Sequence, residues 1–227
     1  MSFKWDNEYL AGLAKDYLSL PKNEAAVVRI LAAFYHSVTF EILHDHFKNS
    51  VKGFASKAIA NSLQVTINSL VRKEFIEVIN DFGIKYKLRG HYSKVVIRLL
   101  EQSGLLIDYA EECEWLEADN EFYWIYNDNY IVRKGVLDLY LGEPSGIHTL
   151  FSHFETNPEH PIFAICGEEF DKNCFQCFAP RIKKLVLPLI LRIFTEFFTD
   201  DFEIANYARS HIDAYSKLIK AQLSVDL

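Results

Sequence analysis

The chain has 227 residues, half of them hydrophobic, and a net charge of −7, which exclude a disordered polypeptide and favour one large domain or two small ones. The first ten residues, MSFKWDNEYL, contain no apolar segment of the kind a secretory signal needs. Charges and Pro188 interrupt the most apolar stretch, 182–198, so we expect no membrane span and a cytoplasmic protein.

The net charge conceals two halves of opposite sign. Residues 1–103 have 14 basic and 10 acidic side chains, whereas residues 104–227 have 10 and 21. The stretch 48–98 has a net charge of +7, and the stretch between Arg98 and Arg133 has nine acids and no base. Because local charge governs polyanion binding, the acidic average does not exclude a nucleic-acid partner.

Helical spacing of apolar residues and helix-end signals predict three helices in the first fifty residues. The first, Asn7–Leu20, is expected to be capped by Asp6 and to end at Pro21. Asn23–His36 and Thr39–Phe47 are the second and third. A loop over 48–55, which contains Gly53, follows.

Residues 56–72 give the clearest pattern in the chain. Ser56 is a predicted N-cap, and Ile59, Leu63, Ile67 and Leu70 fall on one face of the helix. The opposite stripe holds only hydrogen-bond donors and amides: Lys57, Asn61, Gln64, Asn68 and Arg72. No Asp or Glu occurs from 48 to 73, whereas an exposed helix usually mixes both signs. The polar stripe is therefore a candidate contact surface.

A β-hairpin is predicted directly after this helix. Its strands are Phe75–Ile79 and Ile84–Leu88, joined by the turn sequence Asn80-Asp81-Phe82-Gly83. Strand alternation puts Lys85, Lys87 and Arg89 on the face opposite Ile84, Tyr86 and Leu88. Such lysines either contact a polyanion or protect an edge strand from aggregation. A helix over Ser93–Gln102 closes this part of the chain.

A donor-lined helix followed by a basic hairpin resembles the recognition helix and wing of a winged-helix DNA-binding domain. The resemblance covers residues 23–102, approximately, and points to no specific family. It implies double-stranded DNA as the partner, with Lys57, Asn61, Gln64 and Asn68 in the major groove. Arg72, Lys85, Lys87 and Arg89 are then expected to hold the DNA backbone. The eight-residue connection 48–55 departs from the turn of about 3–4 residues in a compact helix-turn-helix.

The expected fold class is α+β and predominantly helical, with an N-terminal winged helix in domain 1–103 and a mixed α/β domain over 104–227. The second domain is predicted to contain an acidic helix, a hairpin, a buried strand and two final helices, at Asp108–Glu117, Phe122–Tyr126 with Tyr130–Val132, Ile162–Cys166, Arg181–Phe198 and Phe202–Leu223. Its acidic surface has several interpretations: it docks on a protein partner, self-associates, folds back onto the basic face, or only maintains solubility.

No motif in the chain predicts an enzyme, a cofactor or a metal site. Cys174 and Cys177 form a CxxC, with Cys166 and His160 upstream, but a zinc site needs four ligands and the fourth is unconvincing. Buried or partly exposed thiols are therefore the preferred interpretation, with zinc and redox roles as alternatives. Phosphate-binding loops, HExxH and GxSxG are missing from the sequence.

The sequence thus predicts a DNA-binding protein, either a regulator or the targeting module of a larger DNA-processing assembly. The alternative is a winged-helix subunit that binds other proteins and not DNA, similar to the winged-helix partners of chromosome-organising ATPases. The lack of acids on helix 56–72 favours DNA, because a pure interaction surface has little reason to exclude them.

Overall fold

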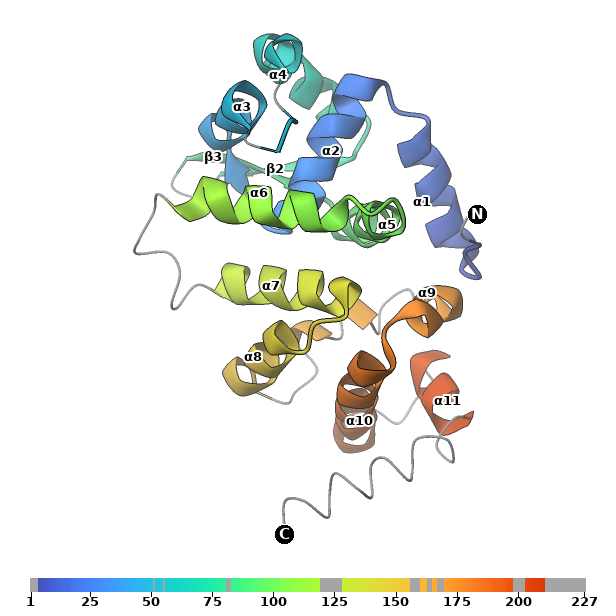
Figure 1. Cartoon of the computed structure of the whole chain (residues 1–227). Helices are drawn as coiled ribbons and strands as arrows, with labels where there is room; N and C mark the ends of the chain where they lie inside the picture. Colours follow the sequence, from blue (N-terminus) through green and yellow to red (C-terminus); the bar gives the residue numbers. More distant parts are fainter. Residues whose placement is uncertain are drawn as a thin grey trace. The chain divides into compact units, whose positions relative to one another are not determined.

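The computed structural model describes residues 4–50, 52–54, 56–80, 83–118, 128–155, 160–162, 165–166, 170–197 and 203–210 (Figure 1). Contacts divide the chain into two compact units. One unit is Gly12–Leu137, and the other combines Met1–Ala11 with Asp138–Leu227. The boundary predicted near residue 103 lies inside the first unit.

The first unit is mostly helical with one small sheet. Its elements, some of which continue past the unit boundaries, are α1 (Glu8–Leu18), α2 (Lys22–Phe34), β1 (Val38–Thr39), α3 (Phe40–Asn49), α4 (Lys57–Arg72), β2 (Ile76–Asn80), β3 (Ile84–Leu88), α5 (Gly90–Gln102), α6 (Leu106–Ala118) and α7 (Asp128–Leu141). A predominantly helical α+β class is therefore confirmed. The acidic helix predicted at Asp108–Glu117 is also confirmed, as α6.

Helix α2 forms the centre of this unit and packs against α4, α5, α6 and β3. Its residues Val27, Ile30 and Phe34 are fully buried, as are its neighbouring apolar side chains. A helix that is hydrophobic on nearly all sides belongs in a core. Each large side chain buried in this way stabilises the fold by about 1.5–3 kcal/mol.

Helix α4 has the two faces that its sequence predicts. The Ser56 hydroxyl oxygen accepts a hydrogen bond from the Ile59 amide at 3.4 Å and caps the helix. Leu63, Ile67 and Leu70 are fully buried. The Glu24 carboxylate of α2 holds the other end of α4, because it accepts a hydrogen bond from the Ser69 hydroxyl at 2.8 Å and pairs with the Lys73 ammonium at 2.6 Å. This helix is thus fixed at both ends.

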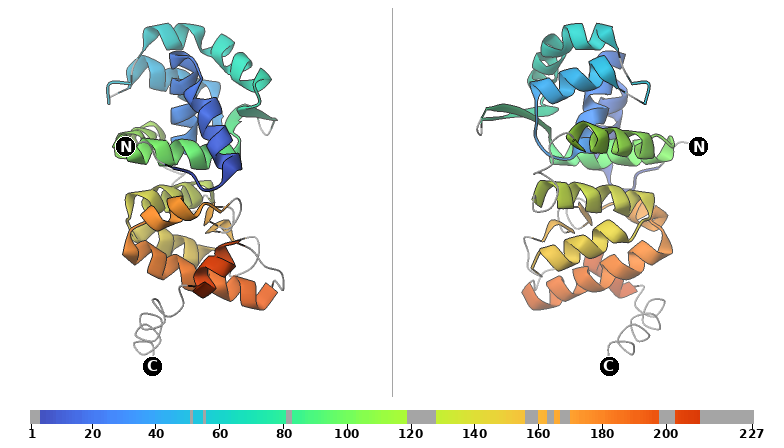
Figure 2. Two further views of the ribbon diagram at one scale, coloured as in Figure 1. Left: turned by 90° about the vertical axis from the view of Figure 1, so that its right-hand side faces the viewer. Right: turned by 60° about the vertical axis from the view of Figure 1, so that its left-hand side comes forward.

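The sheet is antiparallel, with the strand order β1–β3–β2. Tyr86 of β3 lies between Val38 of β1 and Val78 of β2. Near the helices the inward-facing residues of the strands are buried, but the hairpin extends beyond the helices (Figure 2). Val78 and Ile84 are therefore 43% and 57% exposed, although they lie on the apolar face. Strand β1 is too short to be recognised by alternation in the sequence.

The predicted cap of the first helix is wrong by one residue. Asn7 caps α1, because its Oδ1 accepts a hydrogen bond from the Leu10 amide at 3.1 Å. The Asp6 carboxylate instead accepts one from the Asn173 amide at 3.3 Å. Both Asp and Asn are good N-caps, so residue type alone does not decide between adjacent candidates.

The described elements of the second unit, apart from the ends of α1 and α7, are the helices α8 (Ser145–His153), α9 (Lys172–Cys177), α10 (Pro180–Phe197) and α11 (Glu203–Ser210). The two final helices are confirmed as far as Ser210. In the described part of this unit none of the predicted strands is found, so the mixed α/β expectation is wrong there. Each described helix is too short or too polar to cross a membrane.

The strand predictions failed on short apolar segments. Tyr130–Val132, predicted as the second strand of a hairpin, lies in α7, and Ile162, Ile165 and Cys166 have a helical backbone. Short apolar runs do not distinguish a buried strand from a buried helical segment. The partner strand predicted at Phe122–Tyr126 lies outside the described residues.

Asp171 joins the N-terminal segment of the second unit to the rest of that unit. Its Oδ2 accepts hydrogen bonds from the Asp6 and Asn7 amides, each at 2.9 Å, and its Oδ1 caps α9 by accepting one from the Cys174 amide at 2.8 Å. Burial raises the pKa of the Asp171 carboxyl group. Three amide donors therefore compensate for much of the cost of burying this side chain.

Candidate nucleic-acid interface

The outward face of α4 is polar and exposed. The structure places all five predicted contact residues of this helix in solvent: Lys57, Asn61, Gln64, Asn68 and Arg72. Gln64 donates a hydrogen bond from Nε2 to Oδ1 of Asn68 at 3.1 Å, and Arg72 donates one from Nε to the Asn68 carbonyl oxygen at 3.3 Å. The bond between the two amides holds one donor and one acceptor in place and leaves the others available.

One apolar side chain interrupts this polar face. Val65 follows Gln64 and is 70% exposed. An exposed Val near the middle of a donor-lined helix has two uses: it contacts a thymine methyl group in a groove, or it packs against an apolar surface of another protein.

The hairpin provides further basic residues on β3. Lys85 and Lys87 alternate with the buried Tyr86, so their side chains leave from the opposite face of the strand. Arg89 is exposed and directly precedes α5. The acid Glu77 lies directly opposite Lys87 in the register of β2 and β3. The basic face of the hairpin therefore also carries one acid.

Ion pairing distinguishes several of the predicted contact residues from other basic residues of the described chain. Lys52, Lys73, Arg98 and Arg181 each form an ion pair with a carboxylate. In contrast, the predicted contact residues Lys57, Arg72, Lys87 and Arg89 form no ion pair with any described residue. Their charges are thus available to an external anion.

The connection between α3 and α4 is held by α6, through residues that the sequence pattern alone does not pair. The Lys52 amide donates a hydrogen bond to Oε2 of Glu112 at 3.2 Å. The Lys52 ammonium pairs with Glu111, and Asp108 Oδ1 lies 3.7 Å from it. Hydrogen bonding to Glu111 raises the pKa of Lys52. The ring of Phe54 stacks on that of Tyr109 with centroids 4.1 Å apart.

A buried histidine lies beside the same carboxylate. His46 and Glu112 are 1% and 0% exposed, and His46 Nδ1 is 3.3 Å from Glu112 Oε1. Neither atom has a hydrogen-bond partner among the described residues. Burial lowers the pKa of His46 to about 4, so the imidazole is neutral at pH 7. The burial of His46 could have been predicted from the sequence, because His46 comes three residues after the apolar Leu43 and so lies on the same face of α3.

No group of three metal-binding side chains occurs within the described ranges. Cys166 and Cys174 are buried and Cys177 is exposed. His160 Nδ1 accepts a hydrogen bond from the Ile162 amide at 3.1 Å, and burial lowers the pKa of this histidine. The other ring nitrogen of His160, Nε2, is buried and has no hydrogen-bond partner among the described residues.

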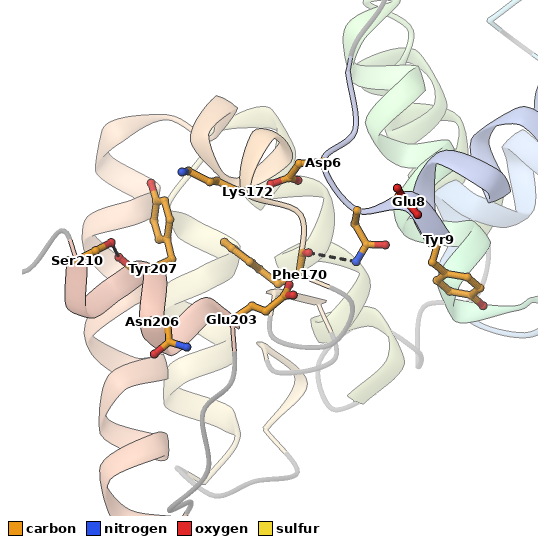
Figure 3. A pocket seen from close by; sticks show the side chains of 10 residues that line it. Asp6, Glu8, Tyr9, Phe170, Lys172, Glu203, Asn206, Tyr207 and Ser210 are labelled. Carbon is orange, nitrogen blue, oxygen red and sulfur yellow. Dashed lines mark hydrogen bonds between the residues drawn. The ribbon is translucent and has the colours of Figure 1, made fainter.

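The second unit contains a pocket of about 600 Å³ (Figure 3). Phe170 and Tyr207, both largely buried, line it together with more exposed polar residues. Its carboxylates, Asp6, Glu8 and Glu203, are all exposed. The pocket therefore has an aromatic lining and an acidic, solvated rim, and none of its lining residues belongs to α4 or the hairpin.

Comparisons of the chain with protein-family models, with curated proteins and with solved structures find no match.

Proposed function

We propose that this chain is a DNA-binding protein of the winged-helix type, in which α4 enters the major groove and the β2–β3 hairpin acts as the wing. In this assignment it is a regulator or the targeting module of a larger DNA-processing assembly. The observation that carries the proposal is the exposed, acid-free face of α4, whose Lys57 and Arg72 are not neutralised by described carboxylates.

The order of elements supports this proposal. Helices α2, α3 and α4 precede the hairpin in the chain. Strand β1, which lies between α2 and α3 in the sequence, pairs with β3 of the hairpin. Such an arrangement presents one helix and one hairpin from a common helical core. Base-edge contact would come from Lys57, Asn61, Gln64 and Asn68, since amides pair bidentately with adenine and cations with guanine. Phosphate contact would come from Arg72 and the hairpin residues Lys85, Lys87 and Arg89.

The test is a binding titration on duplex DNA at several salt concentrations. Three to five phosphate contacts predict that log K falls linearly with log[salt], with a slope of roughly −2.7 to −4.5. The same titration on heparin measures the part of binding that any polyanion provides. If no salt-sensitive DNA binding is found at about 50 mM salt, the proposal is contradicted, because electrostatic contacts are stronger at low salt.

A protein-interaction module without DNA contact is the second candidate. The observation that favours it is the exposure of three apolar side chains, Val65 on α4 and Val78 and Ile84 on the hairpin. Val65→Asp combined with Ile84→Asp distinguishes the candidates. An interaction module would lose its protein partner, whereas a DNA-binding protein would keep a salt-dependent affinity through Arg72 and Lys87.

A further inference from the structure

Two unusual features of the sequence meet in the structure. The α3–α4 connection is longer than a compact helix-turn-helix allows, and the helix that follows α5 is strongly acidic. Helix α6 brings its carboxylates to this connection, at Lys52. The long connection and the acidic helix are therefore parts of one contact.

The described residues of the connection form hydrogen bonds near both of its ends. Its Ser56 amide donates a hydrogen bond to the Phe47 carbonyl oxygen of α3 at 2.7 Å, and the Phe54 amide donates one to the Ser50 hydroxyl at 3.2 Å. Gly53 has a φ of 80°, in the left-handed region that glycine tolerates, and it follows directly on Lys52. The chain thus turns at Gly53, directly after Lys52, whose amide donates a hydrogen bond to Glu112.

Glu112 is suited to hold this turn because it is fully buried and fixed on a helix. One carboxylate oxygen accepts a hydrogen bond from the Lys52 amide, and the other faces His46 of α3. A buried acceptor of this kind defines the position of its donor more closely than the exposed pair between Lys52 and Glu111 does. Lys52 lies five residues before Lys57, the first residue of α4.

We propose that Glu112 is a positioning residue for DNA binding, which clamps the α3–α4 connection and thereby fixes the first turn of α4 for entry into the groove. The part of this inference that concerns DNA binding rests on the proposed function, whereas the contact between Glu112 and Lys52 does not. Acidic helix α6 is in this view an internal part of the DNA-binding unit and not a separate interaction surface.

The test compares Glu112→Met with Glu112→Gln, two variants of similar length. Only Gln retains an oxygen that can accept the Lys52 hydrogen bond. We expect amide hydrogen exchange at Lys52 and in the first turn of α4 to become at least about tenfold faster in Glu112→Met and to change little in Glu112→Gln. Exchange at Leu63–Leu70 should stay unchanged in both.

DNA affinity should follow the same order. Glu112→Met should bind about 3–10-fold more weakly with the salt slope of the natural protein, because no phosphate contact is removed. Glu112→Gln should stay within about twofold of the natural protein. The control Glu114→Met removes an exposed carboxylate from the same helix and should leave exchange at Lys52 unchanged.

Three results separate the possible failures. Equal Lys52 exchange in Glu112→Met and Glu114→Met would overturn the clamp. Faster exchange with unchanged DNA affinity would overturn its role in positioning α4. If the natural protein does not bind DNA, the proposed function fails, and the exchange comparison still decides whether the clamp exists.

Discussion

Helices α4 and α6 belong to the same compact unit and carry opposite charge, and they use that charge in different directions. In α4 the apolar residues other than Val65 mostly face the core, and the predicted contact residues face solvent. In α6 the carboxylates of Asp108, Glu111 and Glu112 turn to the unit's own α3–α4 connection. A run of like charge in a sequence therefore does not reveal whether its partner is external or internal. The burial of individual side chains does.

Reversing charge on the external surface should have the largest effect. Arg72→Glu combined with Lys87→Glu removes two cations and adds two repulsive charges, so we expect DNA affinity to fall on the order of 1,000-fold, about 4 kcal/mol. Both side chains lie outside the core, so the unfolding temperature should change little. Filter binding and thermal unfolding measure the two quantities.

The matched control for this pair is Lys15→Glu with Lys22→Glu, which changes the charge equally at other exposed positions of the first unit. This control should lower the affinity only through net charge, by much less than the α4 and hairpin pair. Equal losses would mean that binding, if present, is not directed to the face of α4.

The internal contact should instead be visible as a pH dependence of stability. The pKa of His46 is lowered by burial to about 4 in the folded protein, from 6.5 in the unfolded chain. Its contribution is therefore present above about pH 6.5 and is lost as the pH falls towards 4, since the unfolded state binds the proton more readily. We expect a loss on the order of 3 kcal/mol in the free energy of unfolding over that interval.

Urea unfolding at pH 7, 6, 5 and 4 measures this loss. The groups that face His46 are Glu112 from α6 and Asp45 from its own helix. The variant His46→Gln lacks the titrating group but not these carboxylates, so its stability should fall less steeply below pH 6.5. Parallel pH profiles for the two proteins would show that His46 is not the group responsible.

A smaller effect is expected where α4 is attached to α2. Glu24→Ala removes the acceptor of the Ser69 hydroxyl and the partner of Lys73, and should lower the free energy of unfolding by about 1–2 kcal/mol. Lys73 is 44% exposed and regains water, which limits the loss. Glu114→Ala, at an exposed site of α6, should cost less than about 0.5 kcal/mol. Equal costs in urea unfolding would contradict this role of Glu24.

The sequence predicted the external face of α4 directly, whereas it offered an internal contact of the acidic residues only as one of several interpretations and did not identify the residues involved. Helix α4 was predictable because its cap at Ser56 and the 3.6-residue spacing of Leu63, Ile67 and Leu70 are local signals that agree. Contact between His46 and Glu112 joins residues 66 positions apart, which no periodicity records. The single available hint was a polar residue on the apolar face of α3.

The errors in the second half have the same origin. Apolar runs such as Ile162–Cys166 are short enough to be read as strands, and only tertiary contacts decide their backbone conformation. The acids of α6 were equally open to several interpretations, because solvation, partner binding and internal pairing all accept the same residues. The contact of α6 with Lys52 shows that Asp108, Glu111 and Glu112 pair within the unit.

The smallest expected effect concerns the hairpin, where an acid opposes the proposed wing. Glu77 lies directly across from Lys87, and cross-strand neighbours share a face of the sheet, so its carboxylate repels a phosphate held by that lysine. Glu77→Gln should therefore tighten DNA binding about 2–5-fold, or roughly 0.4–1 kcal/mol, with the larger gain at low salt. Glu114→Gln makes the same charge change on α6 and should give a smaller gain in the same titration. If both variants gain equally, Lys87 contributes to binding only through the net charge of the protein, and the hairpin is not a wing that touches DNA.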